Sequence, residues 1–287
     1  MKTNSILFVG CGDLGCSTGG RLLAAGWQVT GQRRNADLLP AGFSGVAADY
    51  TTPGSLDFIA ALAPDYVVAT FNPSERSEQG YRSGFTGGTR NLLAGLGGHR
   101  PKAIITASST RVYAERDGGW VDEGSDLARD DLRATAMIAA EQLLLDSPHR
   151  ASVVRFAGIY GAAAGRLLQR IQRGDVAPEF PVRYSNRIHR DDCAGFLCHL
   201  LECAERGDEL APVYNGVDDL PAPQFEVESW LAAQLGVSIA APGMHTESPS
   251  NSNSPGHKRC SNRLLHASGY ELIYPDYRSG YGAVLAA

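Results

Sequence analysis

Short apolar runs alternate with longer amphipathic segments through the first half of this 287-residue chain. A buried strand of a parallel sheet reads as a continuous apolar run, whereas a helix repeats its apolar positions every three to four residues. Six runs predict strands, at 5–10, 28–32, 45–49, 66–71, 102–109 and the start of 151–161. Helices are predicted between them, at 14–26, 55–63, 81–97 and 132–147. This alternation predicts an α/β fold with a doubly wound parallel sheet.

The pattern loosens after residue 161. Further helices are predicted at 164–174, 190–204 and 225–236, and the stretch 242–258 has so few apolar residues that it predicts a long, mobile loop. We expect a main domain over 1–161, to which 186–206 returns, and a smaller lobe with the C-terminal segment over 162–287.

Composition narrows the possible partners. The chain is 43% hydrophobic, enough for a sizeable core, and has a formal charge of −5 with no basic stripe, which argues against nucleic acid. No apolar run approaches the roughly 18 residues of a membrane span. The N-terminal apolar run is too short for a secretory signal, so we expect a cytoplasmic protein.

The six cysteines predict neither a disulfide framework nor a metal site. A reducing cytosol argues against disulfides. Cys193, Cys198 and Cys203 are five residues apart on a predicted helix, so each thiol is turned about 140° from the last and the three cannot converge on one ion. We expect buried, unreactive thiols.

A glycine-rich segment follows the first predicted strand. Gly10, Gly12 and Gly15 have the spacing of a dinucleotide-binding loop: the first makes a tight turn, the second admits a pyrophosphate, and the third lets helix and strand pack closely. The helix N-terminus, at Asp13 and Leu14, would stabilise the phosphate charge. The alternative, an ordinary glycine-rich turn, explains this context less well. The motif predicts a Rossmann-type NAD(P)-binding domain.

The end of the second strand indicates which cofactor is bound. NAD sites usually carry an acidic residue there, whereas this chain has Arg33 and Arg34, whose guanidinium groups suit the 2′-phosphate of NADP. NADP is therefore predicted over NAD, the alternative being two solvated surface arginines. Asp49 is an expected adenine contact, and Thr70 and Phe71 complete the expected cofactor site.

Five segments occur in a characteristic order: GCGDLG (10–15), SSTRVYA (108–114), RFAGIYG (155–161), NRIHRDDCA (186–194) and SNRLLHASGYELIYPDY (261–277). Together they resemble the extended short-chain dehydrogenase/reductase family, which includes nucleotide-sugar epimerases and dehydratases. The resemblance covers nearly the whole chain. It implies that Ser109 holds the catalytic serine position, where the family hydrogen-bonds the substrate carbonyl or hydroxyl.

The partners that this resemblance implies for Ser109 are missing. The family places a Tyr and a Lys four residues apart on the next long helix, where the Lys charge lowers the pKa of the Tyr. Counting back from EQLLL (141–145) puts these positions at Arg133 and Met137, and no Tyr in the chain is followed by Lys four residues later. The family's helix asparagine falls on Phe85. The chain is therefore closer to the atypical short-chain dehydrogenases, known as NAD-dependent epimerase/dehydratases.

Other residues are candidates for substrate contacts. We expect Asn72, Tyr160 and Arg187 in the substrate site, with Arg187 suited to an anionic group, and Ser74 facing the cofactor groove. For the remaining candidates a structural role is the stronger interpretation: Tyr113, a packing His189, Asp191 and Asp192 as helix caps, and Lys258 as an exposed loop residue.

Two functions remain open. The first is an NADP(H)-dependent oxidoreductase or epimerase-like enzyme, with Ser109 polarising a carbonyl of a nucleotide sugar or other small compound and another group or water supplying the proton. The alternative is a non-catalytic NADP(H)-binding sensor or partner-binding protein. An open polar cleft beside Ser109 favours the enzyme, whereas Met137 and Phe85 filling that space would refute it. Helices 80–97 and 132–147 are also expected to form a homodimer interface.

Overall fold

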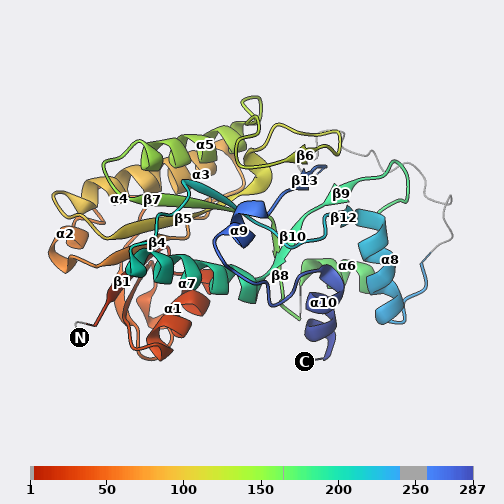
Figure 1. The fold of residues 1–287 in the computed structure, drawn as a ribbon, viewed down its shortest axis with the longest axis horizontal. Coiled ribbons are helices and arrows are strands. Elements are labelled where there is room, and N and C mark those ends of the chain that lie inside the picture. Colours follow the sequence, from red (N-terminus) through yellow and green to blue (C-terminus); the bar gives the residue numbers. More distant parts are fainter. Residues whose placement is uncertain (1–2, 164, 240–256, 287) are drawn as a thin grey trace.

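A seven-stranded parallel sheet forms the centre of the computed structural model, which describes residues 3–163, 165–239 and 257–286 (Figure 1). The strand order is β3-β2-β1-β4-β5-β7-β11, and every neighbouring pair is parallel. The strands are β1 (Ser5–Val9), β2 (Gln28–Arg33), β3 (Ser44–Ala47), β4 (Tyr66–Ala69), β5 (Ala103–Ser109), β7 (Ala151–Phe156) and β11 (Val213–Gly216). This confirms the predicted doubly wound α/β fold.

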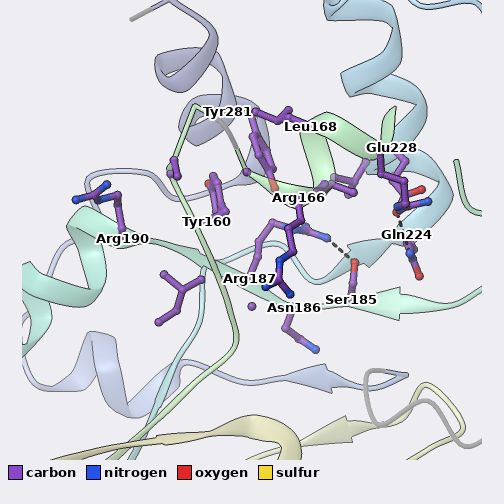
Figure 2. A pocket seen from close by; sticks show the side chains of 18 of the residues that line it. Tyr160, Arg166, Leu168, Ser185, Asn186, Arg187, Arg190, Gln224, Glu228 and Tyr281 are labelled. Atoms are coloured by element: carbon purple, nitrogen blue, oxygen red, sulfur yellow. Dashed lines mark hydrogen bonds and ion pairs between the residues drawn. The ribbon is translucent and has the colours of Figure 1, made fainter. Parts of the chain in front are cut away.

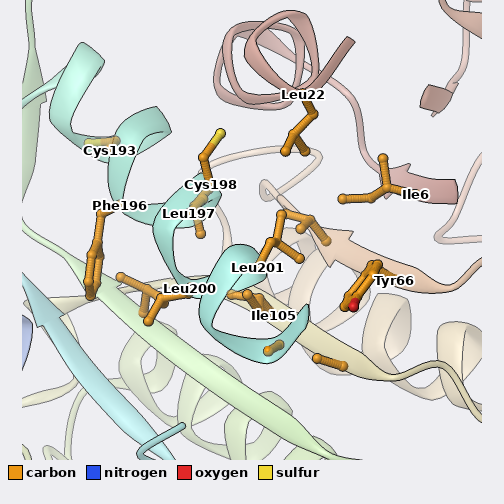
Figure 3. Close-up of a cluster of buried hydrophobic side chains, with 14 of the residues drawn as sticks. Ile6, Leu22, Tyr66, Ile105, Cys193, Phe196, Leu197, Cys198, Leu200 and Leu201 are labelled. Carbon is orange, nitrogen blue, oxygen red and sulfur yellow. The ribbon is translucent and has the colours of Figure 1, made fainter. Parts of the chain in front are cut away.

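Both faces of the sheet are buried, as a continuous apolar strand requires. Ile6 and Phe8 of β1 belong to the cluster under α1 (Asp13–Ala24) and α7 (Arg190–Arg206), shown in Figure 3. Leu7 and Val9 belong to the opposite cluster, under α2 (Phe58–Leu62), α4 (Gly88–Leu96) and α5 (Leu132–Leu145). Since successive strand residues point to opposite faces, the apolar run of β1 serves both layers.

All six predicted strands are present, with ends that differ by up to three residues. The seventh, β11, was not predicted. Its residues, VYNG, are few and include the polar Asn215, so they carry almost no periodic signal. The strand nevertheless pairs with β7, and Asn215 is fully buried. The Asn215 backbone amide donates to the Glu123 carboxylate at 2.8 Å, and its side-chain Oδ1 accepts from the Tyr113 hydroxyl at 2.6 Å.

The helix predicted over 81–97 is longer and less regular than expected. It consists of α3 (Glu78–Tyr81), a π-helical turn η2 (Arg82–Gly87) and α4. Gly84 lies in the π turn, where a Cβ atom would stand 2.4 Å from the carbonyl oxygen of Asn72. A glycine is therefore required for the helix to approach the segment that follows β4.

The second half supplies a third cluster of apolar residues among α6 (Arg166–Gln172), α8 (Gln224–Gln234) and α10 (Tyr277–Ala286). Short strand pairs connect it to the sheet: β8 (Gly158–Tyr160) with β10 (Arg187–His189), β9 (Tyr184–Ser185) with β12 (Ala222–Pro223), and β6 (Trp120–Val121) with β13 (Arg259–Cys260). The short elements η1 (Ala36–Leu38), η3 (Thr110–Val112) and α9 (Arg263–Ala267) complete the fold.

The polar stretch 242–258 falls outside the described residues except for its last two. Within the described residues, no helix is long and apolar enough to cross a membrane.

Candidate functional site

A groove of about 340 Å³ lies at the carboxyl ends of β1, β2 and β4. Strand order reverses between β1 and β4, and ligands of open α/β sheets bind at such a switch point. The lining residues are Gly10, Cys11, Gly12, Arg33, Arg34, Asn35, Leu38, Asp49, Tyr50, Thr51, Thr70, Asn72, Pro73 and Ser74.

The glycine loop has the geometry that a pyrophosphate requires. Gly10 has φ +76°, and a Cβ there would stand 3.0 Å from the Thr70 carbonyl oxygen. The Thr70 hydroxyl donates to the Gly10 carbonyl at 2.8 Å and fixes the turn. A Cβ on Gly12 would meet only the Gly10 carbonyl, at 3.9 Å, so space remains open beside the first turn of α1. The backbone N–H groups of that turn suit an anion.

Two arginines and one aspartate set the charge of the groove. The half-buried Arg33 donates to the Leu38 carbonyl at 3.4 Å, and Arg34 is exposed. Burial acts to raise the pKa of Asp49, but hydrogen bonds from the Thr51 hydroxyl and amide outweigh it and lower the pKa, so Asp49 is ionised at neutral pH. The Arg34 charge also acts to lower the pKa of Asp49.

Some residues expected around the cofactor lie elsewhere. Phe71 does not line the groove: it is 5% exposed, belongs to the core and packs against the Tyr50 ring at 4.9 Å. Gly15 is buried, and a Cβ there would stand 3.1 Å from the Cys11 sulfur, which is the close helix–strand packing expected of it. Asp13 and Leu14 line a second cavity beside the groove.

Asn72 lies in the cofactor groove with Ser74, whereas we expected Asn72 among the substrate contacts. The Tyr50 hydroxyl donates to the Asn72 carbonyl at 2.9 Å and accepts from the Asn72 amide at 3.1 Å, which holds the chain after β4 against the groove. The structure therefore separates Asn72 from Tyr160 and Arg187.

The second cavity, of about 650 Å³, brings Tyr160 and Arg187 together (Figure 2). Both come from the paired strands β8 and β10. It begins where the groove ends, because Gly12 lines the groove and Asp13 lines the cavity. Further side chains come from α1, α6, α8 and α10: Ser17, Arg166, Leu167, Leu168, Arg170, Gln224, Val227, Glu228 and Tyr281.

Tyr160 is a wall of this cavity and a poor acid. Its ring stacks on Tyr281 at 4.3 Å between centroids, and its hydroxyl donates to the Asp276 carbonyl at 3.4 Å. Burial raises the pKa of Tyr160 far above its usual value, and the nearby Asp218 carboxyl adds to the effect. The phenol therefore holds its proton across the physiological range.

The hydroxyl cluster at the end of β5 is mainly structural. The Ser108 hydroxyl donates to the Glu141 carboxylate at 2.5 Å, and the Ser109 Oγ accepts from the Arg111 amide at 3.2 Å as the cap of η3. The Ser109 hydroxyl hydrogen has no acceptor among the described residues, so it can still donate. Ser109 itself is not among the described residues that line either cavity.

The positions of the missing catalytic partners are occupied by packed side chains. Phe85 and Met137, 8% and 3% exposed, belong to one core cluster together with Val112. Arg133 donates to the Arg76 carbonyl at 2.8 Å and lies over the Tyr81 ring. These positions therefore stabilise the fold and offer no proton-transfer group.

Two of the expected structural roles need correction. His189, not Asp191 or Asp192, caps α7, because its Nδ1 accepts from the Asp191 amide at 3.2 Å. Asp192 is fully buried and accepts from the amides of Ile273 and Tyr274, at 2.7 and 3.0 Å, so it anchors the C-terminal segment.

Lys258 is buried, which contradicts its expected exposure in a loop. Only 1% of it is exposed, and its Nζ donates to the Thr110 carbonyl at 3.2 Å. The cause is the pairing of β13 with β6, which draws the preceding residue beneath the end of β5. Burial lowers the pKa of Lys258 to about 8.

No group of His, Cys, Asp or Glu side chains in the described part of the chain could hold a metal ion. Cys193, Cys198 and Cys203 are buried along α7, as predicted for packing thiols.

The fold and the groove define an NAD(P)-binding protein of the Rossmann type. No family model matches the chain. Protein YeeZ of Escherichia coli strain K12 is 27% identical over 281 residues, which cover 94% of this chain and 96% of YeeZ. A solved structure from Methylobacillus flagellatus, assigned to the NAD-dependent epimerase/dehydratases, is 35% identical, covers 99% of this chain and 98% of its own, and has a TM-score of 0.83. The chain belongs to the NAD-dependent epimerase/dehydratase family.

Two more distant solved structures share the fold. Human epimerase family protein SDR39U1, solved with NADPH, is 20% identical, covers 98% of this chain and 99% of its own, and has a TM-score of 0.76. Bordetella bronchiseptica WbmG, solved with NAD and UDP, is 16% identical, covers 99% of this chain and 94% of its own, and has a TM-score of 0.80.

Proposed function

We propose that the chain is an NADP(H)-dependent oxidoreductase or epimerase-like enzyme that acts on a small compound held in the second cavity. One observation carries this proposal: the glycine loop borders both spaces, with Gly10 and Gly12 in the groove and Asp13 and Leu14 in the cavity. A dinucleotide whose pyrophosphate lies at the start of α1 would have its adenosine half in the groove and its nicotinamide half toward the cavity.

The choice of NADP rests on Arg33 and Arg34. Arg33 is the last residue of β2 and Arg34 follows it, where a 2′-phosphate is expected, and a charge-assisted hydrogen bond to phosphate favours NADP over NAD. Both kinds of cofactor occur among the structural neighbours, since SDR39U1 was solved with NADPH and WbmG with NAD.

The bound nicotinamide would supply or accept the hydride. In a reduction, the hydride adds to the substrate's carbonyl carbon and the carbonyl oxygen takes a proton from water. Ser109, at the end of β5, lines neither cavity, and the packing of Phe85 and Met137 in the core counts against catalysis centred on it. Ser109 would hydrogen-bond that oxygen only if the substrate extends from the second cavity toward β5, which the Ser109→Ala variant tests. Tyr160 keeps its proton too tightly to replace the missing dyad. General acid catalysis typically contributes about 10²–10⁴-fold, so we expect slower turnover than an intact Tyr–Lys pair would give.

A second function is favoured by the burial of Phe85 and Met137 in the core. With those positions closed, the same groove would serve a non-catalytic NADP(H) sensor. The two functions share cofactor binding and differ in whether any substrate consumes the bound cofactor.

Cofactor binding is tested by titrating NADPH and NADH and following nicotinamide fluorescence. We expect Arg33→Ala to weaken NADPH binding by about 10- to 100-fold and to leave NADH binding nearly unchanged, since each charged hydrogen bond contributes about 1.5–3 kcal/mol. Arg129→Ala, which removes an exposed arginine outside the groove, is the matched control. Equal affinities for NADPH and NADH in the unmodified protein would refute the choice of NADP.

Catalysis is tested by screening carbonyl compounds, including nucleotide sugars, for loss of NADPH absorbance. Turnover that falls in Ser109→Ala while NADPH affinity is retained supports the enzyme. NADPH binding without turnover across the panel supports the sensor.

A further inference from the structure

In the described part of the chain, three of the arginines that line the second cavity lack an acidic partner. Arg166, Arg187 and Arg190 make no ion pair within 3–163, 165–239 and 257–286, whereas Arg170 pairs with Glu228 and Asp175. Arg187 is only 6% exposed. Its Nη2 donates to the Ser185 hydroxyl at 2.5 Å, and its Nη1 is buried without a hydrogen-bond partner among those residues.

The Asp218 carboxyl group interacts with the Arg187 charge, but no ion pair joins the two side chains. Asp218 is 1% exposed, and its Oδ2 also lacks a hydrogen-bond partner in the described structure. Burial raises the pKa of Asp218 to about 8, although the Arg187 charge acts to lower it, so Asp218 is mostly protonated at neutral pH. A buried cation without a counter-charge is costly, which makes this site receptive to an anion.

Arg166 brings a second positive charge to the same place. Figure 2 draws its side chain, from the start of α6, near that of Arg187 in this view, and both line the cavity, which therefore carries two positive charges. The acid on that side, Glu228, is already occupied, because it accepts from Arg170, the Ala177 amide and the Gln224 amide group. Asp13, from α1, is the other acid that lines the cavity, and no ion pair joins it to these arginines.

The rest of the cavity suits an apolar body. Its apolar side chains come from α1, β8, α6 and α8: Leu14, Ile159, Leu167, Leu168 and Val227. Ile159 is 49% exposed, so its side chain is accessible to a ligand in the cavity. The stacked rings of Tyr160 and Tyr281 add a flat wall.

We propose that the substrate of this cavity is an organic anion with an apolar body, whose phosphate or carboxylate group is bound between Arg166 and Arg187. This inference rests on the proposed function only in that it calls the bound anion a substrate. The binding site itself stands on the arrangement of the arginines and the apolar wall, and it is testable without turnover.

The probe is 8-anilino-1-naphthalenesulfonate, an aromatic anion whose fluorescence rises on binding, titrated in the presence of saturating NADP⁺. We expect Arg166→Gln to weaken probe binding by about tenfold or more, as the loss of one charged hydrogen bond predicts. Arg173→Gln is the matched control, because Arg173 is exposed at the end of the same helix and does not line the cavity. Arg166 is also exposed, so its variant should fold normally.

Displacement of the probe identifies the anionic group. Phenyl phosphate and phenylacetate distinguish a phosphate from a carboxylate source, and benzyl alcohol, which has the apolar body without the charge, should displace the probe poorly. Equal displacement by all three would overturn the proposal, as would equal probe affinity in Arg166→Gln and Arg173→Gln.

NADPH titration of the same variants separates the two proposals. If NADPH still binds but probe affinity does not change in Arg166→Gln, the anion site is refuted and the proposed function stands. If NADPH does not bind but probe affinity falls in Arg166→Gln, the anion site is supported and the proposed function is refuted.

Discussion

The buried ion pair between Arg155 and Glu141 offers a sharp test of how the end of β5 is held. Each side chain is 5% exposed, and the Arg155 Nη2 and Nε donate to the Glu141 Oε2 at 2.7 and 3.1 Å. Ser108 donates to the other carboxylate oxygen, so one acid on α5 fixes both β5 and β7. Glu141→Ala would leave the Arg155 charge buried without its ion-pair partner and with only its hydrogen bond to the Glu123 carbonyl, at 3.3 Å, among those that the structure gives.

Removing one member of a buried pair costs about 3–5 kcal/mol, whereas replacing both with apolar groups is often nearly neutral. We therefore expect Glu141→Ala to lower the free energy of unfolding by about that amount. The double variant with Glu141→Leu and Arg155→Met should recover much of the loss. The measurement is urea unfolding followed by circular dichroism, analysed as a double-mutant cycle.

Glu78→Ala is the control for this cycle. It breaks an exposed pair with Arg82, at 4.0 Å, and should cost less than about 1 kcal/mol. Our reasoning fails if the losses from the single changes at Glu141 and Arg155 simply add in the double variant, because the two groups would then not depend on each other.

Three further predictions concern the cofactor loop and two buried titratable groups. Gly10→Ala should weaken NADPH binding and lower the melting temperature, because a Cβ would clash with the Thr70 carbonyl at a left-handed φ; unchanged titration and melting curves would contradict this. The pKa of Asp218 is raised from 3.8 to about 8, so the folded state binds more protons between these values and the unfolding free energy should fall as pH rises from about 4 to 8. Asp218→Asn should lack that fall in urea unfolding at pH 5 and pH 8. The pKa of Lys258 is lowered from 10.5 to about 8, so the unfolded state binds more protons there and stability should rise with pH across that window. Lys258→Met should lose this rise, and a variant whose unfolding free energy still rises with pH would show that Lys258 does not cause it.

The sheet could be predicted because each predicted strand is signalled by its own short segment of sequence. Most of the predicted strands contain a short apolar run, although 28–32 is largely polar, and the glycine loop identifies β1 as the strand beside the switch point. The groove follows from this, since Arg33 and Arg34 lie at the end of β2, beside β1, and Asp49 follows β3, the next strand outward. A homodimer through α5 and residues 80–97 stays a prediction.

Of the second cavity, the sequence analysis predicted only Tyr160 and Arg187 as substrate contacts, because its other residues share no sequence signal. Arg166 begins a short helix, Arg187 lies in a three-residue strand, and Tyr281 is in the last helix, so only tertiary packing brings them together. The burial of Lys258 was missed for a similar reason: the two-residue strand β13 pairs with β6, more than 100 residues earlier in the chain.

The position of β11 has a consequence for synthesis of the chain. Strand β7 ends at residue 156, but its outer neighbour begins at residue 213. Until the ribosome has released that later segment, the nascent sheet has an open edge of unpaired backbone groups on β7. Such edges recruit strands from other chains. A product truncated between α7 and β11 would therefore contain the whole cofactor groove and still tend to aggregate.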